Sequence, residues 1–128
     1  MMGCSCSCSC SSDNEGGVTL IYACSGGSNT GLAADSVART LSSRNVGAMT
    51  CLAAVGASLS GFIVSAGESG KNVLIDGCKV GCGARIFKER NLPFDHYLIT
   101  DFGVVKGETP ITAELTDSLA DRISERIQ

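Results

Sequence analysis

The sequence predicts an α/β fold with three layers, in which helices flank a mostly parallel sheet of about four strands. Short apolar runs of strand length alternate along the chain with segments whose apolar residues recur at helical spacing. Most of these runs end in turns rich in Gly, Ser, Asn or Asp, where a strand would give way to a helix. Because parallel strands need crossover connections, this alternation favours right-handed strand–helix–strand units.

The first strand–helix unit follows the N-terminal segment. Residues 18–23 are mostly apolar and lead into CSGGSNTG at residues 24–31, which indicates a buried strand and its exit loop. Apolar side chains then recur mostly at helical spacing over residues 31–43, so we expect an amphipathic helix there. Residues 46–54 are small and apolar and are interpreted as a short second strand, and residues 59–66 as a helix.

A second clear unit lies in the C-terminal half. Residues 71–77 form an apolar run broken by a turn, and residues 84–90 continue as a helix that ends before Pro93. Residues 97–99 are a further strand. The last segment repeats an apolar residue at every fourth position, which predicts an amphipathic helix on one face of the sheet, with Thr112 as its cap. The repeated residues are Leu115, Leu119, Ile123 and Ile127. The predicted architecture is Rossmann-like or flavodoxin-like.

The chain has the length of one ordinary domain. Residues 1–17 are a low-complexity Cys/Ser segment followed by polar residues, with no apolar periodicity, so we interpret them as a flexible N-terminal tail. Residues 18–128 are then a single α/β domain. With 44% hydrophobic and 18% charged residues, the composition is that of a soluble globular protein rather than a disordered one.

Charge and hydropathy exclude several classes of partner. The net charge is −3 and Lys and Arg form no run, so the sequence indicates neither nucleic acid nor an anionic membrane as a partner. No apolar run reaches the about 18 residues that span a bilayer, and the N-terminus does not resemble a secretory signal. We therefore expect a cytoplasmic protein. Its protein partners are not indicated by the sequence.

Eight cysteines are many for a chain of this length. In a reducing compartment, metal ligation or thiol chemistry explains them better than disulfides. Functional groups of open α/β sheets gather beyond the carboxyl ends of the strands, and four of the cysteines follow predicted strands. Cys24 follows the first strand, Cys51 lies in or after the second, and Cys78 follows the strand at residues 71–77, with Cys82 in the first turn of the next helix.

These four thiols predict a zinc site. Residues four apart on a helix share a face, so Cys78 and Cys82 are expected to direct both sulfurs at one point. Cys24 and Cys51 would complete a tetrahedron of thiolates at about 2.3 Å, the closed coordination of structural zinc. The alternative without function is that each cysteine is a small buried hydrophobic residue.

Other chemistries use the same residues. Four thiolates also hold an iron–sulfur cluster. Cys24 with its Gly-rich loop resembles the nucleophile loop of low-molecular-weight phosphatases and arsenate reductases, whose arginine six residues later is replaced here by Thr30. Without that arginine, an oxyanion would lack its bidentate partner. A redox pair of Cys78 and Cys82 is less favoured because the spacing is not C-x-x-C.

Several short motifs resemble the DGC-domain family, whose members are proposed to bind zinc. The matching segments are Cys24-Ser25-Gly26, Cys51-Leu52-Ala53, Asp76-Gly77-Cys78 with Cys82, and Asp101-Phe102-Gly103-Val104. The resemblance implies a metal site made of four cysteines, which carry over to Cys24, Cys51, Cys78 and Cys82. It implies no reaction, so we expect a metal-binding protein without an assigned catalytic activity.

Two residues beside the expected ligands have supporting roles. Asp76 is placed to bond loop amides or to support a ligand thiolate, with a simple turn aspartate as the alternative. Gly77 is expected to allow a close backbone approach that a side chain would block. The single histidine, His96, precedes a predicted strand and is expected at the surface.

The tail contains four further cysteines in alternation with serine. Cys4, Cys6, Cys8 and Cys10 would form an accessory metal site if the tail bends around a soft ion, as in a protein that stores or delivers metal. An inert extension is the alternative.

Deleting residues 1–12 tests the ranking of the two cysteine groups. We expect the truncated chain to fold and to retain one bound metal, because the predicted ligands all lie in residues 18–128. Circular dichroism and metal analysis check this. Loss of both the fold and the metal would make the tail the primary site.

Overall fold

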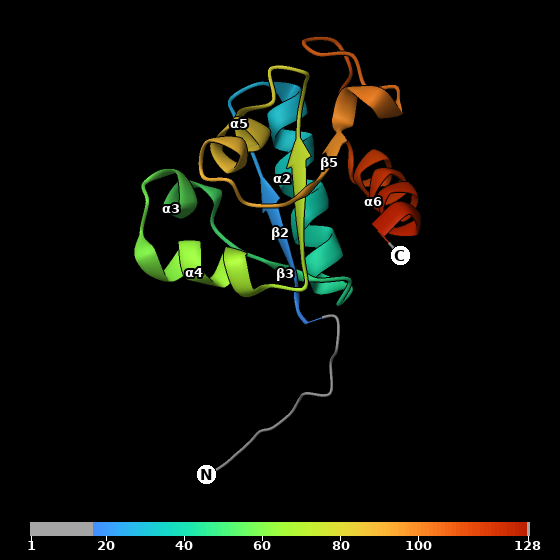
Figure 1. The fold of residues 1–128 in the computed structure, drawn as a ribbon. Helices are drawn as coiled ribbons and strands as arrows, with labels where there is room; N and C mark the ends of the chain where they lie inside the picture. The colour runs from blue at the N-terminus through green and yellow to red at the C-terminus, as the bar shows by residue number, and fades with distance from the viewer. Residues whose placement is uncertain (1–16, 128) are drawn as a thin grey trace.

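The predicted fold class is confirmed by the computed structural model, which describes residues 17–127 (Figure 1). The strands are β2 (Thr19–Ala23), β3 (Ala48–Met49), β4 (Lys71–Asp76) and β5 (Asp95–Leu98). The helices are α2 (Asn29–Ser43), α3 (Leu52–Gly56), α4 (Ser60–Glu68), α5 (Cys82–Glu89), the 3-10 helix η1 (Ile99–Phe102) and α6 (Ala113–Ile127). None of the helices within residues 17–127 combines the length and the apolar character needed to cross a bilayer.

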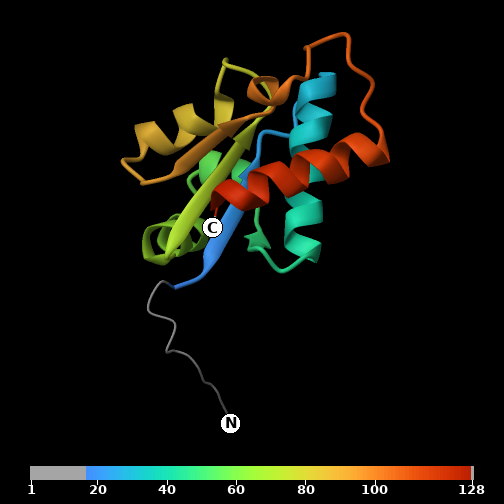
Figure 2. The ribbon, with the colours of Figure 1, turned by 90° about the vertical axis from the view of Figure 1, so that its right-hand side faces the viewer.

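The four strands form one parallel sheet in the order β3-β2-β4-β5. Helices α2 and α6 pack together on one face of the sheet, while α3, α4 and α5 lie on the other (Figures 1 and 2). This arrangement gives three layers, with helices on both sides of the strands. Because helices cover both faces of the central strands, the sequences of these strands are continuous apolar runs and do not alternate between apolar and polar residues.

Two apolar cores result from the alternation of side chains along the central strands. In β2, Ile21 joins the core beneath α2 and α6, whereas Tyr22 joins the core beneath α3, α4 and α5. In β4, Val73 and Ile75 belong to the first core and Leu74 to the second. All five side chains are at most 1% exposed, so each central strand is buried on both faces.

The second predicted strand is much shorter in the structure. The second strand does not extend over residues 46–54: β3 has only two residues, and the chain enters α3 at Leu52. The burial pattern agrees with a helix, because Leu52 and Val55, three residues apart, both belong to the second core. The cap of α6 is as predicted, since the Leu115 amide donates to the Thr112 hydroxyl at 3.1 Å.

The strand order creates a crevice at the carboxyl edge of the sheet. From β2 the chain crosses through α2 to β3, and from β4 it crosses through α5 to β5 on the opposite side. Because α2 and α5 cover opposite faces, the loops after β2 and β4 separate and leave a space between them. In open α/β sheets this reversal point is the usual place for a ligand.

Gly77 brings these two loops into direct contact. A Cβ atom on Gly77 would lie 2.6 Å from the carbonyl carbon of Thr30, which is itself fully buried. The Gly77 amide donates to the Cys24 sulfur at 3.2 Å. The structure therefore confirms the expected close approach, and a side chain at this position would separate the loops.

Replacing Gly77 with alanine should destabilise the fold. We expect Gly77→Ala to lower the free energy of unfolding by about 2 kcal/mol, the usual cost of inserting a methyl group into a filled space. Urea denaturation followed by circular dichroism measures the change, since the chain has no tryptophan. Gly27→Ala is the matched control, because a Cβ there meets nothing within 4 Å. Equal stability of the two variants would contradict the contact.

Candidate functional site

A small cavity of about 240 Å³ occupies the crevice between the loops after β2 and β4. Three of the four predicted cysteine ligands line it: Cys24, Cys78 and Cys82. The rest of the wall is formed by Asp76, by the side chain of Lys106 and by small residues of the two loops. The structure therefore brings three of the four cysteines selected by the strand-end argument to one cavity.

Cys24 continues β2 by one residue. Its amide donates to the Ile75 carbonyl at 3.2 Å, so it is still held against β4. The next residue, Ser25, has a positive φ of 54° that turns the chain away from the strand into the Gly-rich loop. The Ser25 hydroxyl donates to Asp35 at 2.8 Å and holds this turn. The Cys24 sulfur is thereby fixed at the end of the strand.

Cys78 and Cys82 are brought together by a turn, not by a shared helix. Helix α5 begins at Cys82, after Gly81 with its left-handed φ of 68°, so Cys78 lies before the helix. The Gly81 amide donates to the Cys78 carbonyl at 3.0 Å and closes the turn. The expected four-residue helical spacing therefore does not apply, although both cysteines line the same cavity.

Lys106 places a positive charge beside the cysteines. Its ammonium nitrogen lies 3.4 Å from the Cys78 sulfur. The loop that carries it is tied to the start of α2 by the Asn29 side chain, whose amide group donates to the carbonyls of Val105 and Thr109. The carbonyl oxygen of the same side chain accepts from the Gly107 amide at 2.7 Å. Sequence reasoning missed Lys106 because only the folded chain places this loop over the cavity.

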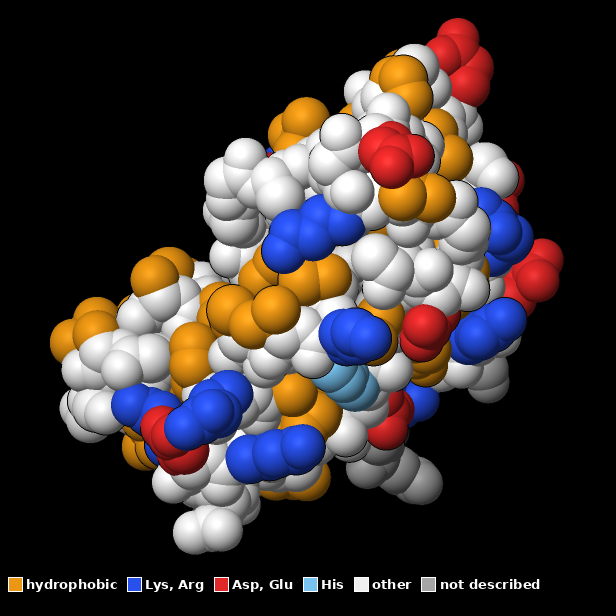
Figure 3. All heavy atoms as spheres, turned by 90° about the horizontal axis from the view of Figure 1, so that it is seen from above, with side chains coloured by type: hydrophobic (Ala, Val, Ile, Leu, Met, Phe, Trp, Pro, Cys, Tyr) orange, Lys and Arg blue, Asp and Glu red, His pale blue; other side chains and the backbone are white. Residues whose placement is uncertain are grey.

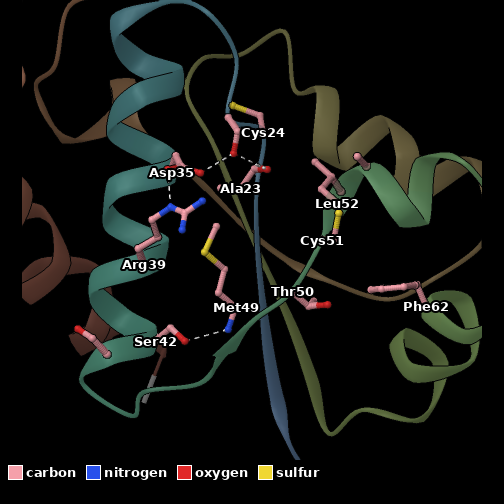
Figure 4. A pocket seen from close by; sticks show the side chains of 13 residues that line it. Ala23, Cys24, Asp35, Arg39, Ser42, Met49, Thr50, Cys51, Leu52 and Phe62 are labelled. Atoms are coloured by element: carbon pink, nitrogen blue, oxygen red, sulfur yellow. Dashed lines mark hydrogen bonds and ion pairs between the residues drawn. The ribbon is translucent and has the colours of Figure 1, made fainter.

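Cys51 lies apart from the other three cysteines. It precedes α3, is exposed, and lines a larger neighbouring cavity of about 890 Å³. Cys24 lines both cavities and so forms their common wall. Figure 4 shows the residues of the larger cavity. Among residues 17–127, no three His, Cys, Asp or Glu side chains are arranged so that they could hold a metal ion as they stand. Cys4, Cys6, Cys8 and Cys10 lie outside the described residues.

Asp76 is the buried acidic group of the site, with 1% of its surface exposed. One carboxylate oxygen accepts from the Gly83 amide at 2.9 Å, and the other accepts from the Ala84 amide at 3.2 Å. The second oxygen also lies 2.6 Å from His96 Nε2. Asp76 thus bonds backbone amides, as one of the two interpretations expected, and it joins the ends of β4, α5 and β5.

His96 has a role that its sequence context does not indicate. Position 96 was expected at the surface, and the residue is indeed exposed, yet its ring bonds the buried Asp76 carboxylate. The contact arises because β5 pairs with β4 with His96 opposite Leu74, two residues before Asp76. Only the register of the sheet makes the two side chains neighbours.

The surface above the site combines apolar and basic groups. Figure 3 looks onto the carboxyl edge of the sheet, where hydrophobic side chains, drawn in one colour with cysteine, run between lysine and arginine side chains. Acidic side chains are fewer near the middle of this face. Such a surface suits ligands that are partly apolar and negatively charged.

Removing the Asp76 carboxylate should weaken the fold strongly. We expect Asp76→Ala to lower the free energy of unfolding by about 3 kcal/mol, because two buried amides lose their acceptor. Asp101→Ala is the control, since Asp101 is exposed and its side chain has no hydrogen-bond or ion-pair partner among the described residues. Urea denaturation compares the variants. If Asp76→Ala were as mild as the control, the carboxylate would not anchor α5.

Two comparisons relate this chain to known proteins. The family model of the DGC domain matches residues 20–127. The "Anaerobic and virulence modulator AnvM" of Pseudomonas aeruginosa is 32% identical over 89 residues, which cover 68% of this chain and 67% of AnvM. No solved structure gives a significant match. The chain therefore belongs to the DGC-domain family.

Proposed function

We propose that the protein binds one zinc ion at the crevice between β2 and β4, with Cys24, Cys78, Cys82 and Cys51 as ligands. The observation that carries the proposal is that three of these cysteines line one small cavity although they come from two distant loops. Cysteine clusters of this kind in a fold rich in free thiols favour a soft or borderline-soft cation. Zinc, which accepts thiolates without redox chemistry, is the first choice.

The surroundings fit the charge of such a centre. A zinc ion bound by four thiolates carries net negative charge, and nearby hydrogen-bond donors stabilise it. The Gly77 amide already points at the Cys24 sulfur, and the Lys106 ammonium lies beside the Cys78 sulfur. Asp76 would support the metal site indirectly, because its bonds to the amides of Gly83 and Ala84 hold the helix that begins with Cys82.

Cys51 is the ligand that must travel furthest. It lies on the cavity next to the crevice, so its sulfur joins the others only if the segment between β3 and α3 moves toward Cys24. That segment is exposed at Cys51 and follows a strand of only two residues. We therefore expect Cys24, Cys78 and Cys82 to supply most of the affinity and Cys51 to close the site.

Metal analysis of the protein purified without added metal tests the proposal. We expect about one zinc per chain and no visible absorbance, whereas an iron–sulfur cluster would absorb visible light. Cys78→Ser should abolish the bound zinc and lower the thermal midpoint, because metal binding contributes to folding stability. Cys51→Ser should retain zinc with reduced affinity. Undiminished zinc in Cys78→Ser would refute the proposed ligand set.

A thiol enzyme with Cys24 as nucleophile is the second candidate. Its support is that Cys24 alone among the described cysteines lines both cavities, so a substrate in either one would meet its sulfur. At the position where phosphatase-like enzymes have arginine, the loop has the uncharged Thr30. Its side chain is buried and bonds the Ser28 hydroxyl. Without that charge, the loop offers an oxyanion only backbone amides.

Alkylation rates separate the two candidates. An activated nucleophile reacts at mildly acidic pH, where ordinary thiols are almost entirely protonated. In metal-free, reduced protein at about pH 6, a nucleophilic Cys24 would react with iodoacetamide faster than the more exposed Cys82. We expect the reverse order for a metal-binding protein. Mass spectrometry of the labelled peptides measures both rates in one sample.

A further inference from the structure

We propose that the larger cavity, beside the cysteine site, binds a small molecule with an apolar aromatic body and one negatively charged group. The cavity has a volume of about 890 Å³ and lies between α2, the end of β3, α3 and α4. Sites for small molecules and cofactors commonly have about 300–1,000 Å³. Of the four cysteines only Cys24 and Cys51 touch this cavity, and neither is needed for the contacts argued below.

The apolar part of the wall comes from three side chains on different elements. Met49 extends into the cavity from the end of β3, Leu52 comes from α3, and Phe62 points inward from α4 (Figure 4). Phe62 is 37% exposed, which leaves part of its ring open to the cavity. A methionine and an aromatic ring that line the same open space suit a flat apolar group.

The charged part of the wall is the guanidinium of Arg39. Arg39 Nε donates to Asp35 at 2.7 Å, and Figure 4 shows the guanidinium directed from α2 into the cavity. Its two Nη groups have no partner among the described residues, and 70% of its side chain is exposed. The planar edge formed by these groups is suited to a carboxylate, sulfonate or phosphate.

Asp35 does not make the cavity a site for cations. One of its oxygens accepts from Arg39 and the other from the Ser25 hydroxyl, so both are occupied. The hydrogen bond from Arg39 lowers the pKa of Asp35, and the carboxylate stays charged near neutral pH and orients the guanidinium. A cationic ligand would have to displace Arg39, whereas an anionic ligand uses the donors that Arg39 still has.

A pair of fluorescent probes tests the proposal on the full chain. Anilinonaphthalene sulfonate has the proposed aromatic body and anionic group, and N-phenylnaphthylamine is its neutral counterpart. We expect the sulfonate to bind at one saturable site about tenfold more tightly than the neutral probe, the usual range of one charge-assisted hydrogen bond. Added salt should weaken only the sulfonate.

Two variants separate the charged from the apolar contact. Arg39→Gln should weaken the sulfonate about tenfold and leave the neutral probe unchanged. Phe62→Ala should weaken the binding of both probes by a similar factor of about five.

Each variant has a matched control. Arg85 makes the same kind of ion pair, with Glu89 four residues later, outside the cavity. Val64 lies on α4, is 53% exposed, and does not line the cavity.

The controls Arg85→Gln and Val64→Ala should each stay within about twofold of the wild type. Three results would overturn the proposal: no saturable binding of the sulfonate, equal affinity of the wild type for both probes, or an effect of Arg85→Gln or Val64→Ala as large as that of its partner variant. Circular dichroism of every variant confirms that a loss of binding is not a loss of folding. Zinc content is measured in the same samples, so failure of this cavity is distinguished from failure of the metal site.

Discussion

The carboxyl edge of this sheet depends on one buried carboxylate. Asp76 ends β4 with its side chain almost entirely shielded from water, and a charge in that position is costly unless it is fully hydrogen-bonded. The amides of Gly83 and Ala84 and the ring of His96 provide the bonds. The strand, the following helix and the neighbouring strand are thereby held at a fixed distance. The positions of the cysteines before and at the start of α5 follow from this arrangement.

The second constraint is the absence of a side chain at Gly77. Because the backbone of the β4 loop rests on Thr30, the two loops at the reversal point of the sheet touch instead of parting completely. The space that remains is small and is lined by three cysteines, Asp76, Lys106 and mostly small residues of the two loops.

Local patterns in the sequence predict the parts of the fold that depend on burial alone. Apolar patterns predict the strand at residues 18–23 and the helix with Leu119, Ile123 and Ile127, because the burial of each side chain is reflected in its own residue type. The cysteine positions follow from the rule that the ends of parallel strands share an edge.

Features that join distant residues were not predictable. Lys106 reaches Cys78 because Asn29 holds its loop, and His96 reaches Asp76 because of the strand register. The start of α5 depended on the left-handed conformation of Gly81. Cys51 lies apart from the other three cysteines because β3 ends after two residues, and no apolar pattern in the sequence predicts that early end.

The shortness of β3 has a consequence for the cooperativity of the molecule. This edge strand pairs with β2 over two residues, and the next backbone bond, from the Thr50 amide to the Ile21 carbonyl, is followed directly by the exposed Cys51. Segments with few buried contacts open at lower free energy than the body of a domain. Amide hydrogens of residues 48–51 would therefore exchange with solvent through local opening while β2 and β4 remain closed. The segment at residues 48–51, which carries Cys51, then unfolds locally at a lower free energy than the central strands of the sheet.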